Sequence, residues 1–173
     1  IKIMKIKHAV ITSVDRDDLK DMGSIIWNET IKAVRRLNPT TTLETLIPDF
    51  QGNKTNIDRI IEAAPEVVSH NLETVRRLTR EVRVQAKYDQ SLEVLQYLKQ
   101  MGVNRTKSGI MLGLGEKEEE VYETLHDLRN ASVEVVTIGQ YLQPSKKPLP
   151  VKSFITPETF EKFEAVAKDL GFR

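Results

Sequence analysis

Apolar, β-branched runs alternate with helical patterns along the whole chain, and this alternation limits the folds that the chain can adopt. Parallel strands need a long return connection, which a helix usually supplies in a right-handed crossover. Each strand with its helix takes roughly 25 to 40 residues, the usual size of such a unit. We expect a parallel α/β sheet whose strands cover 7–12, 42–47, 66–70, 106–112 and 133–138.

Amphipathic spacing predicts helices between these strands and after the last one. In the first of them, Trp27, Ile31 and Val34 share one face. Short polar side chains that can accept a hydrogen bond at a helix start mark several N-termini, and Gly102 marks an end. The expected helices begin at the N-caps Ser24, Asn71, Asp89 and Thr156 or cover 55–62 and 117–130.

The 173 residues suit one domain with a substantial core, and no linker or low-complexity segment divides them. Five strand–helix units are too few for an eight-stranded barrel. They could form an open doubly wound sheet or most of a smaller, partly open barrel. Ile1–Lys5 resembles a helix end, and the chain begins with Ile rather than Met, so we expect at least one further unit upstream. The first strand would then have an unpaired apolar edge, which favours aggregation or dimer formation.

Charge and composition argue against several classes of function. Lys and Arg number 26 against 25 Asp and Glu, and this net charge of +1 gives no reason to expect nucleic acid or an anionic membrane as a partner. The apolar runs are too short to span a bilayer and no secretory signal is present, so we expect a cytoplasmic protein. The chain has no cysteine, which excludes disulfides, thiolate metal ligands and a thiol nucleophile.

Polar side chains gather where each expected strand ends. Parallel strands bring their carboxyl ends to one side of a sheet, where α/β proteins bind ligands. In 10–19 an apolar strand gives way to three acids and an arginine, so the strand must stop near Thr12. Helix capping could explain single residues, but the whole set favours a ligand pocket. The expected tip residues are Thr12, Ser13, Asp15, Asp17, Pro48, Asp49, Gln51, His70, Asn71, Glu73, Gly113, Gly115, Glu116, Gly139, Gln140 and Tyr141.

Alternation within 42–47 places Glu44 on the inner face of the sheet, opposite the face of Leu43 and Ile47 that suits helix packing. A carboxylate without a partner is costly there, and Lys107, early in the fourth strand, is the expected partner. The two residues could form an internal ion pair with no ligand, or Glu44 could contact a ligand. The sequence favours neither alternative.

The glycines and histidines carry weaker implications. Gly113-Leu114-Gly115 before a helix is similar to a phosphate-binding loop, but the third glycine of a dinucleotide fingerprint and a following Gly-Lys-Thr/Ser are missing. The three histidines lack the i, i+4 spacing of a metal site, and we interpret His8 and His126 as structural. His70, at a strand tip, is the histidine for which we expect a functional role.

Several long segments together resemble one family, lipoyl synthase, whose members use S-adenosylmethionine radical chemistry. The resemblance extends in order over essentially the whole chain, which makes it far more specific than any short motif. The segments that carry it are VITSVDRDDL (10–19), LIPDFQG (46–52), HNLETV (70–75), RVQAKY (83–88), TKSGIMLGLGE (106–116), TIGQYLQP (137–144) and LGF (170–172).

The resemblance implies a partial (β/α)6 barrel of the TIM type, with 1–173 as one radical-SAM-type domain truncated at both ends. It implies S-adenosylmethionine and two [4Fe–4S] clusters as cofactors, and an electron donor for cluster reduction. A 5′-deoxyadenosyl radical would remove hydrogen from C6 and C8 of an octanoyl-lysine chain on a carrier protein, and the second cluster would supply sulfur. Such a radical needs a dry pocket that holds the C–H bond at contact distance.

The chain departs from the family pattern in one severe way. The family's cluster ligands are a Cys-x3-Cys-x2-Cys motif, a second cysteine triplet and a serine near the C-terminus, and this chain contains no cysteine and ends before that serine motif. We therefore expect an internal fragment that begins just before the second barrel strand and cannot catalyse the reaction alone. Within the long loop 139–153, Lys146-Lys147-Pro148 differs slightly from the family form, with little expected effect.

Carried onto matching positions, the resemblance implies cofactor contacts at the strand tips and on the inner face. Arg76, Arg83 and Lys107 are candidates for pairing with carboxylates of the cofactor or of Glu44. The expected cofactor-binding residues, with no catalytic or metal-binding residue among them, are Thr12, Ser13, Asp15, Asp17, Glu44, Asn71, Glu73, Arg83, Lys107, Gly113, Gln140 and Leu142.

Two other hypotheses stay open. A relative without clusters could bind a nucleoside or an acyl-carrier partner without catalysis, and it would bind S-adenosylmethionine in the absence of iron. An aldolase-like barrel would need a Schiff-base lysine in an apolar pocket, and Lys107 is the strand lysine in a suitable place.

Overall fold

The structure is a computed structural model that describes residues 1–83, 85–145 and 149–173. Strand and helix alternate along it, as the apolar periodicity predicts. The strands are β1 (His8–Thr12), β2 (Thr42–Leu46), β3 (Val67–Ser69), β4 (Arg105–Leu112) and β5 (Val135–Gln140). The helices are α1 (Ser24–Leu37), α2 (Lys54–Ala63), α3 (Thr79–Val82), α4 (Tyr88–Gln100), α5 (Glu118–Asn130) and α6 (Pro157–Asp169), with short 3-10 turns η1 (Phe50–Gly52) and η2 (Arg76–Leu78).

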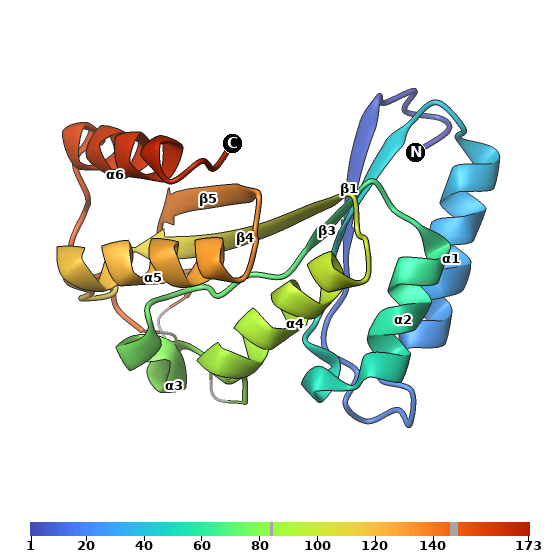
Figure 1. Ribbon diagram of the computed structural model, residues 1–173, viewed down its shortest axis with the longest axis horizontal. Coiled ribbons are helices and arrows are strands. Elements are labelled where there is room, and N and C mark those ends of the chain that lie inside the picture. Colours follow the sequence, from blue (N-terminus) through green and yellow to red (C-terminus); the bar gives the residue numbers. More distant parts are fainter. Residues whose placement is uncertain (84, 146–148) are drawn as a thin grey trace.

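The strands pair in parallel in the order β1-β2-β3-β4-β5, so each strand lies beside its neighbour in the sequence. The sheet curls into a half-barrel with helices around it, which confirms the expected partial TIM-type barrel (Figure 1). The alternative of an open doubly wound sheet is wrong, because its strand order would reverse at a switch point. Within the described residues, β1 and β5 form the two edges.

The two faces of the half-barrel differ in what covers them. In β2, Leu43 and Thr45 point outward and are completely buried beneath the helices, whereas Glu44 points inward. Paired residues of neighbouring parallel strands share a face, so Val10 and Val67, which flank Glu44 in the register, also lie on the inner side. The alternation predicted for this strand is confirmed.

Apolar side chains between the sheet and the helices form two clusters. One joins the first three strands to α1, α2 and part of α4, and Ile31, Leu43 and Ile60 are completely buried in it. The other joins β4 and β5 to α5 and α6, with Leu125 and Leu128 completely buried. Burial of apolar surface contributes about 25 cal/mol per Å², so these clusters are the main stabilisation of the half-barrel.

The helix expected to begin at Asn71 is displaced: helical structure starts only with η2 and continues in α3, although Val75 and Leu78 are buried as expected, and residues 71–75 form a non-helical segment. The segment stays extended beside β4, and Glu73 makes an isolated parallel bridge to Ile110. Hydrogen bonds from Glu73 N to Gly109 O (2.9 Å) and from Met111 N to Glu73 O (2.8 Å) take the place of intrahelical ones. The prediction was wrong because pairing with a neighbouring strand outweighs the local capping preference of Asn.

The starts of two other helices are shifted from expectation. Ser24 is the first residue of α1 rather than its N-cap. Lys87 precedes α4, so Asp89 lies in the first turn, where its charge still suits the helix dipole. The Thr156 cap is confirmed, since its hydroxyl accepts a hydrogen bond from Thr159 N (3.3 Å).

Gly102 follows α4 with a φ of +86°, as expected for a helix stop. The expectations for Lys146-Lys147-Pro148, and Val84 of the segment 83–88, fall outside the described residues. In the part of the chain that the structure describes, no helix is both long and apolar enough to cross a membrane.

Candidate functional site

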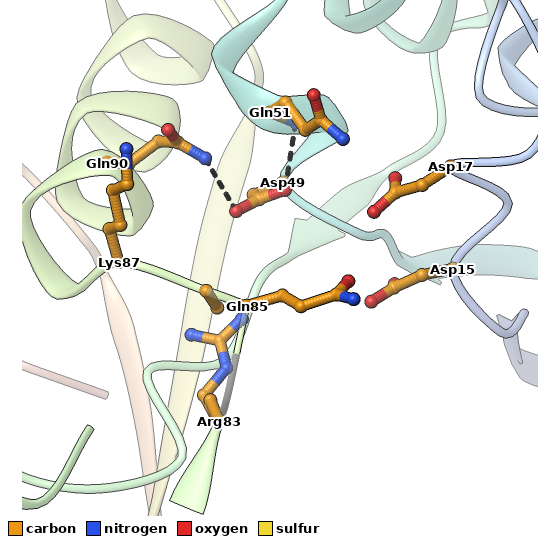
Figure 2. A pocket seen from close by; sticks show the side chains of 9 residues that line it. Asp15, Asp17, Asp49, Gln51, Arg83, Gln85, Lys87 and Gln90 are labelled. Atoms are coloured by element: carbon orange, nitrogen blue, oxygen red, sulfur yellow. Dashed lines mark hydrogen bonds between the residues drawn. The ribbon is translucent and has the colours of Figure 1, made fainter. Parts of the chain in front are cut away.

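A charged cavity of about 570 Å³ opens beyond the carboxyl ends of β1 and β2. Figure 2 shows Asp15 and Asp17 on one side, Asp49 between these two aspartates and Gln90, and Arg83 across from Asp15 and Asp17. The cavity thus presents three carboxylates together with two cationic side chains. Its lining residues are Asp15, Asp17, Asp49, Gln51, Arg83, Gln85, Ala86, Lys87 and Gln90.

The carboxyl of Asp15 is sensitive to the charges around it. Partial burial raises its pKa, the Asp17 and Asp49 carboxylates raise it further, and Arg83 acts in the opposite direction. A positive charge placed among three aspartates would remove this repulsion. The cavity therefore favours a cationic ligand group on the aspartate side and an anionic group near Arg83.

Asp49 is fixed by hydrogen bonds to both of its oxygens. Oδ1 accepts from Gln51 N (2.9 Å) at the start of η1, and Oδ2 accepts from Gln90 Nε2 of α4 (2.8 Å). Dashed lines in Figure 2 mark these two bonds, which join the β2 tip to α4. Asp49 therefore has a defined position before any ligand binds.

A second cavity of about 220 Å³ shares Asp15 and Arg83 with the first and extends along the tips of β1, β2 and β3. Between them, the two cavities collect most of the tip residues that the sequence predicts for the first three strands. The lining residues of the second cavity are Thr12, Ser13, Asp15, Leu46, Ile47, Pro48, His70, Asn71, Glu73 and Arg83.

The hydroxyl groups of Thr12 and Ser13 are tied to the protein around them. Thr12 Oγ1 donates to Leu46 O (3.2 Å), and Ser13 Oγ donates to Val14 O (3.0 Å). Ser13 Oγ also accepts from the indole Nε1 of the buried Trp27 (3.1 Å). A hydroxyl oxygen has two lone pairs, so both side chains can still accept a hydrogen bond from a ligand.

Asn71 and Glu73 reach the second cavity from the extended segment after β3. A Cβ at Gly109 would lie 3.0 Å from Asn71 Oδ1 and 2.8 Å from Thr137 Oγ1, so the glycine lets Asn71 lie against β4. Glu73 has a φ of +66° and is held by its bridge to β4. Strand pairing thus fixes the backbone from which both polar side chains extend.

Glu44 and Lys107 lie on the inner face and line neither cavity. Glu44 Oε1 accepts hydrogen bonds from Lys107 Nζ (3.0 Å) and Ser69 Oγ (2.7 Å), and His8 Nε2 lies 3.7 Å from Oε2. Burial alone would raise the pKa of Glu44, but the two hydrogen bonds and the positive charges outweigh it, and the pKa is lowered. The predicted partner is confirmed, and the geometry supports the internal ion pair.

Two amides of the glycine turn after β4 are already bonded within the turn and are not available to a phosphate. The Glu116 carboxylate accepts hydrogen bonds from Gly113 N (2.6 Å) and Leu114 N (2.9 Å). Gly113 has a φ of +100°, and a Cβ there would collide with Gln140 Nε2 and the Ser153 carbonyl. The space that the missing side chain of Gly113 leaves is therefore occupied by Gln140 and Ser153 of the same chain, not by a ligand.

Gln140 and Leu142, at the tip of β5, lie outside both cavities. Gln140 Nε2 donates to Leu112 O (3.2 Å) and Ser153 O (3.2 Å), and its Oε1 accepts from Ile155 N (2.8 Å). The amide thereby ties the ends of β4 and β5 to the segment before α6. The Leu142 side chain is exposed.

The side chains of His70 and Arg76 are both bonded to other residues of the protein. The imidazole of His70 is buried, and both of its nitrogens bond to protein atoms. Arg76 pairs with Asp89 and Asp127 and lies over the Tyr88 ring, 4.2 Å from its centroid. These contacts hold η2 to α4 and α5, so Arg76 does not pair with Glu44, one of the two partners considered for it.

The sequence pattern missed Lys87 and Gln90, which line the first cavity. Lys87 is the N-cap of α4 and Gln90 lies in its first turn, so neither residue is at a strand end. Asp49 was among the expected tips but not among the expected cofactor contacts. The family resemblance carried a signal for Lys87, because the segment 83–88 is one of those that resemble the family and its residues Arg83, Gln85, Ala86 and Lys87 line the cavity.

A model of the Radical SAM superfamily matches residues 1–128. This range holds every residue that lines the two cavities. The chain belongs to the radical SAM superfamily. The matched range covers β1 to β4 and both cavities, whereas β5 and α6 lie beyond it.

Curated proteins named lipoyl synthase are highly similar to this radical SAM chain. Mitochondrial lipoyl synthase of Nematostella vectensis is 79% identical over 173 residues, which cover 100% of this chain and 60% of that protein. Lipoyl synthase of Christiangramia forsetii is 77% identical over 173 residues and is covered to 59%. The resemblance inferred from the motifs is confirmed, and the chain spans about three fifths of these relatives.

Solved structures share the fold of this superfamily member at low sequence identity. Methylornithine synthase has a TM-score of 0.73 at 15% identity, with 96% of this chain and 49% of that chain covered. HMG-CoA lyase from Brucella melitensis has a TM-score of 0.61 at 12% identity, with 98% and 58% covered. At these identities the likeness shows the barrel fold alone.

Proposed function

We propose that the protein containing these residues inserts sulfur at C6 and C8 of a protein-bound octanoyl-lysine chain, as a lipoyl synthase in protein lipoylation. The observation that carries the proposal is the 79% identity to a protein of that name over all 173 residues. The proposed protein substrate is an octanoylated lipoyl-carrier protein or domain, and a cytoplasmic location and a single domain over 1–173 stay predictions.

The charged cavity fits the amino-acid part of S-adenosylmethionine. This group has an ammonium and a sulfonium that suit Asp15, Asp17 and Asp49, and a carboxylate that suits Arg83. When bound, S-adenosylmethionine supplies by reductive cleavage the 5′-deoxyadenosyl radical that removes hydrogen from the octanoyl chain. The cofactor contacts that we propose are Thr12, Ser13, Asp15, Asp17, Asp49, Asn71, Glu73 and Arg83.

The other expected contacts have a different role in the proposal. Glu44 and Lys107 stabilise the inner face, and Gln140 fixes the tip of β5. Apolar side chains on the inner face, such as Val10, which is 55% exposed, offer a surface for the octanoyl chain. With the octanoyl chain bound against it, this apolar surface would exclude water and hold the C–H bond close to the radical.

Iron–sulfur clusters do not fit the residues of this chain. Such clusters are held mainly by thiolates, and the 173 residues contain no cysteine. Among the described residues, no group of three or more histidine, aspartate or glutamate side chains could hold a metal ion. We therefore propose that residues 1–173 bind cofactor and substrate but are inactive alone, and that cluster ligation and reduction by an electron donor need other residues.

The proposal is tested with the full-length protein, reconstituted with iron and sulfide under anaerobic conditions. With an octanoyl-lysine peptide, S-adenosylmethionine and a reductant, mass spectrometry should detect 5′-deoxyadenosine and a lipoyl-lysine product. Asp15→Asn should reduce product formation, whereas Glu123→Gln, on the exposed side of α5, should not. Absence of the lipoyl product under conditions in which a known lipoyl synthase forms it would refute the proposal.

The two other hypotheses receive unequal support. An aldolase-like reaction needs a Schiff-base lysine in an apolar pocket, and Lys107 instead donates a hydrogen bond to the Glu44 carboxylate. Ligand binding without catalysis is the second candidate, because both cavities form without any cysteine. It predicts that S-adenosylmethionine binds the chain without iron, and calorimetry that detects no binding would refute it.

A further inference from the structure

The imidazole of His70, directly after β3, is 2% exposed and makes two hydrogen bonds inside the protein. Its Nδ1 lies 2.9 Å from Ile47 O, and its Nε2 lies 2.9 Å from Ser91 Oγ. A carbonyl oxygen can only accept, so Nδ1 carries the proton. In the neutral ring Nε2 is then an acceptor, and the Ser91 hydroxyl must donate to it.

Ser91, in the first turns of α4, passes the chain of hydrogen bonds on to Arg83. Its side chain is completely buried, and its Oγ accepts a hydrogen bond from Arg83 Nη1 (3.1 Å). A guanidinium can only donate and a carbonyl can only accept. The donor of each hydrogen bond is therefore determined: Arg83 donates to Ser91, Ser91 donates to His70, and His70 donates to Ile47 O.

This hydrogen-bond relay, formed by Arg83, Ser91, His70 and Ile47 O, holds Arg83 at the junction of the two cavities. Arg83 follows the short helix α3, and its side chain lines both cavities. An arginine side chain has many rotamers, and ordering it on ligand binding costs entropy. The hydrogen bond from Arg83 Nη1 to Ser91 Oγ restricts these rotamers before the ligand binds. The guanidinium has five N–H donors, so others remain for a ligand.

We propose that His70 and Ser91 are positioning residues: they hold the Arg83 guanidinium in the orientation in which it binds the carboxylate of the ligand's α-amino-acid group. The inference deepens the proposed function and rests on it. The ligand is of the α-amino-acid class, with its cationic part among the aspartates across the cavity. A planar guanidinium matches a carboxylate with two parallel hydrogen bonds, and that match depends on orientation.

The experiment compares two probes on the full-length holoenzyme: S-adenosylmethionine and its decarboxylated analogue, which keeps the sulfonium and the amine. Calorimetry gives the Kd of each. Arg83→Gln should raise the Kd for S-adenosylmethionine about tenfold or more, because it removes hydrogen bonds to a charged group. Ser91→Ala should raise it about threefold to tenfold, because the guanidinium remains but loses its support. Neither substitution should change the Kd of the analogue.

Ser24→Ala is the matched control for Ser91→Ala. Ser24 is also completely buried, and its hydroxyl donates to Asn56 Oδ1 (3.0 Å), outside both cavities. This substitution should leave the ratio of the two Kd values unchanged. His70→Asn is a second variant for the case that Ser91→Ala does not fold. The asparagine amide keeps a donor for Ile47 O but has no acceptor at the position of the imidazole Nε2, to which Ser91 donates. This variant should therefore weaken the binding of S-adenosylmethionine but not that of the decarboxylated analogue.

The possible results separate the inference from the proposed function. If Ser91→Ala and His70→Asn weaken both probes equally, or neither, the relay does not position Arg83 and the inference is wrong. If the wild type binds S-adenosylmethionine but Arg83→Gln affects both probes equally, the carboxylate binds elsewhere, and the proposed function stands without the inference. If the wild-type holoenzyme does not bind S-adenosylmethionine, the proposed function itself fails.

Discussion

Lys107 Nζ on β4 lies 3.0 Å from Glu44 Oε1 on β2, across the intervening strand β3. Ser69 on β3 donates to the same oxygen at 2.7 Å, so one carboxylate joins three strands. The Glu44 side chain is 8% exposed and the Lys107 side chain 25%. Because a buried charge without a partner is costly, the loss of one member should do more harm than the loss of both.

Lys107→Met in the full-length protein should lower the free energy of unfolding by about 2–3 kcal/mol, because Glu44 keeps its burial but loses its cation. The double variant Glu44→Gln/Lys107→Met should recover a large part of this loss. Urea unfolding of the wild type, the two single variants and the double variant forms a double-mutant cycle. A coupling energy near zero would contradict the prediction.

The buried His70 should make stability fall at acidic pH. Burial lowers the pKa of its imidazole to about 4, with Arg83 acting in the same direction and Asp49 and the Ile47 carbonyl opposing it. The unfolded chain binds this proton near pH 6.5, so the stabilisation is complete above that pH and is lost as the pH falls from 6.5 to about 4. The loss amounts to at most about 3 kcal/mol.

The measurement for His70 is the free energy of unfolding of the wild type and of His70→Asn between pH 4 and 7. The variant has no imidazole at this position, so its curve should be flatter over that range. Two parallel curves would show that His70 does not titrate differently in the folded and unfolded states.

Binding of S-adenosylmethionine to the full-length protein should weaken as the pH falls through the raised pKa of Asp15. The cation needs the carboxylate form, and Asp15 is protonated more readily because burial and the Asp17 and Asp49 charges raise its pKa. Asp17→Asn removes one of these charges and should move the midpoint of the loss to lower pH. Calorimetry across the acidic range gives the midpoints, with Glu123→Gln as control. A midpoint that does not move would argue against this coupling.

Gln140→Ala should loosen the segment before α6 without affecting the cofactor. The amide of Ile155 loses its acceptor and should exchange its hydrogen faster, and stability should fall by about 1–2 kcal/mol. Because Gln140 lines neither cavity, the Kd for S-adenosylmethionine should stay unchanged. A markedly weaker Kd with normal exchange at Ile155 would instead support the cofactor contact expected from the sequence.

The isolated chain 1–173 should associate with itself. Strand β1 lies at the edge of the described sheet, and its outward backbone groups have no partner strand there. Such an edge pairs readily with another chain. Light scattering after size-exclusion chromatography should show dimers or larger species, and a monodisperse monomer would show the prediction to be wrong.

Features that depend on short-range periodicity were correctly predicted from the sequence. Alternation along β2 separates Leu43 and Thr45 from Glu44, and helical spacing in α5 buries Leu125 and Leu128. These patterns follow from the geometry of a strand and a helix, which each segment has by itself. The parallel half-barrel follows from the strict alternation of strands with helices along the chain. The position of Glu44 on the inner face follows from the two-residue period of β2.

Contacts between segments far apart in the chain were decided only by the tertiary structure. Asn71 stands before an extended segment because β4 is there to pair with it, and Glu116 occupies the glycine turn that looked open to a phosphate. The relay from Arg83 through Ser91 to His70 joins three segments with no common sequence pattern. Such contacts depend on register and on the direction of each side chain after packing, and no local period of the sequence encodes either.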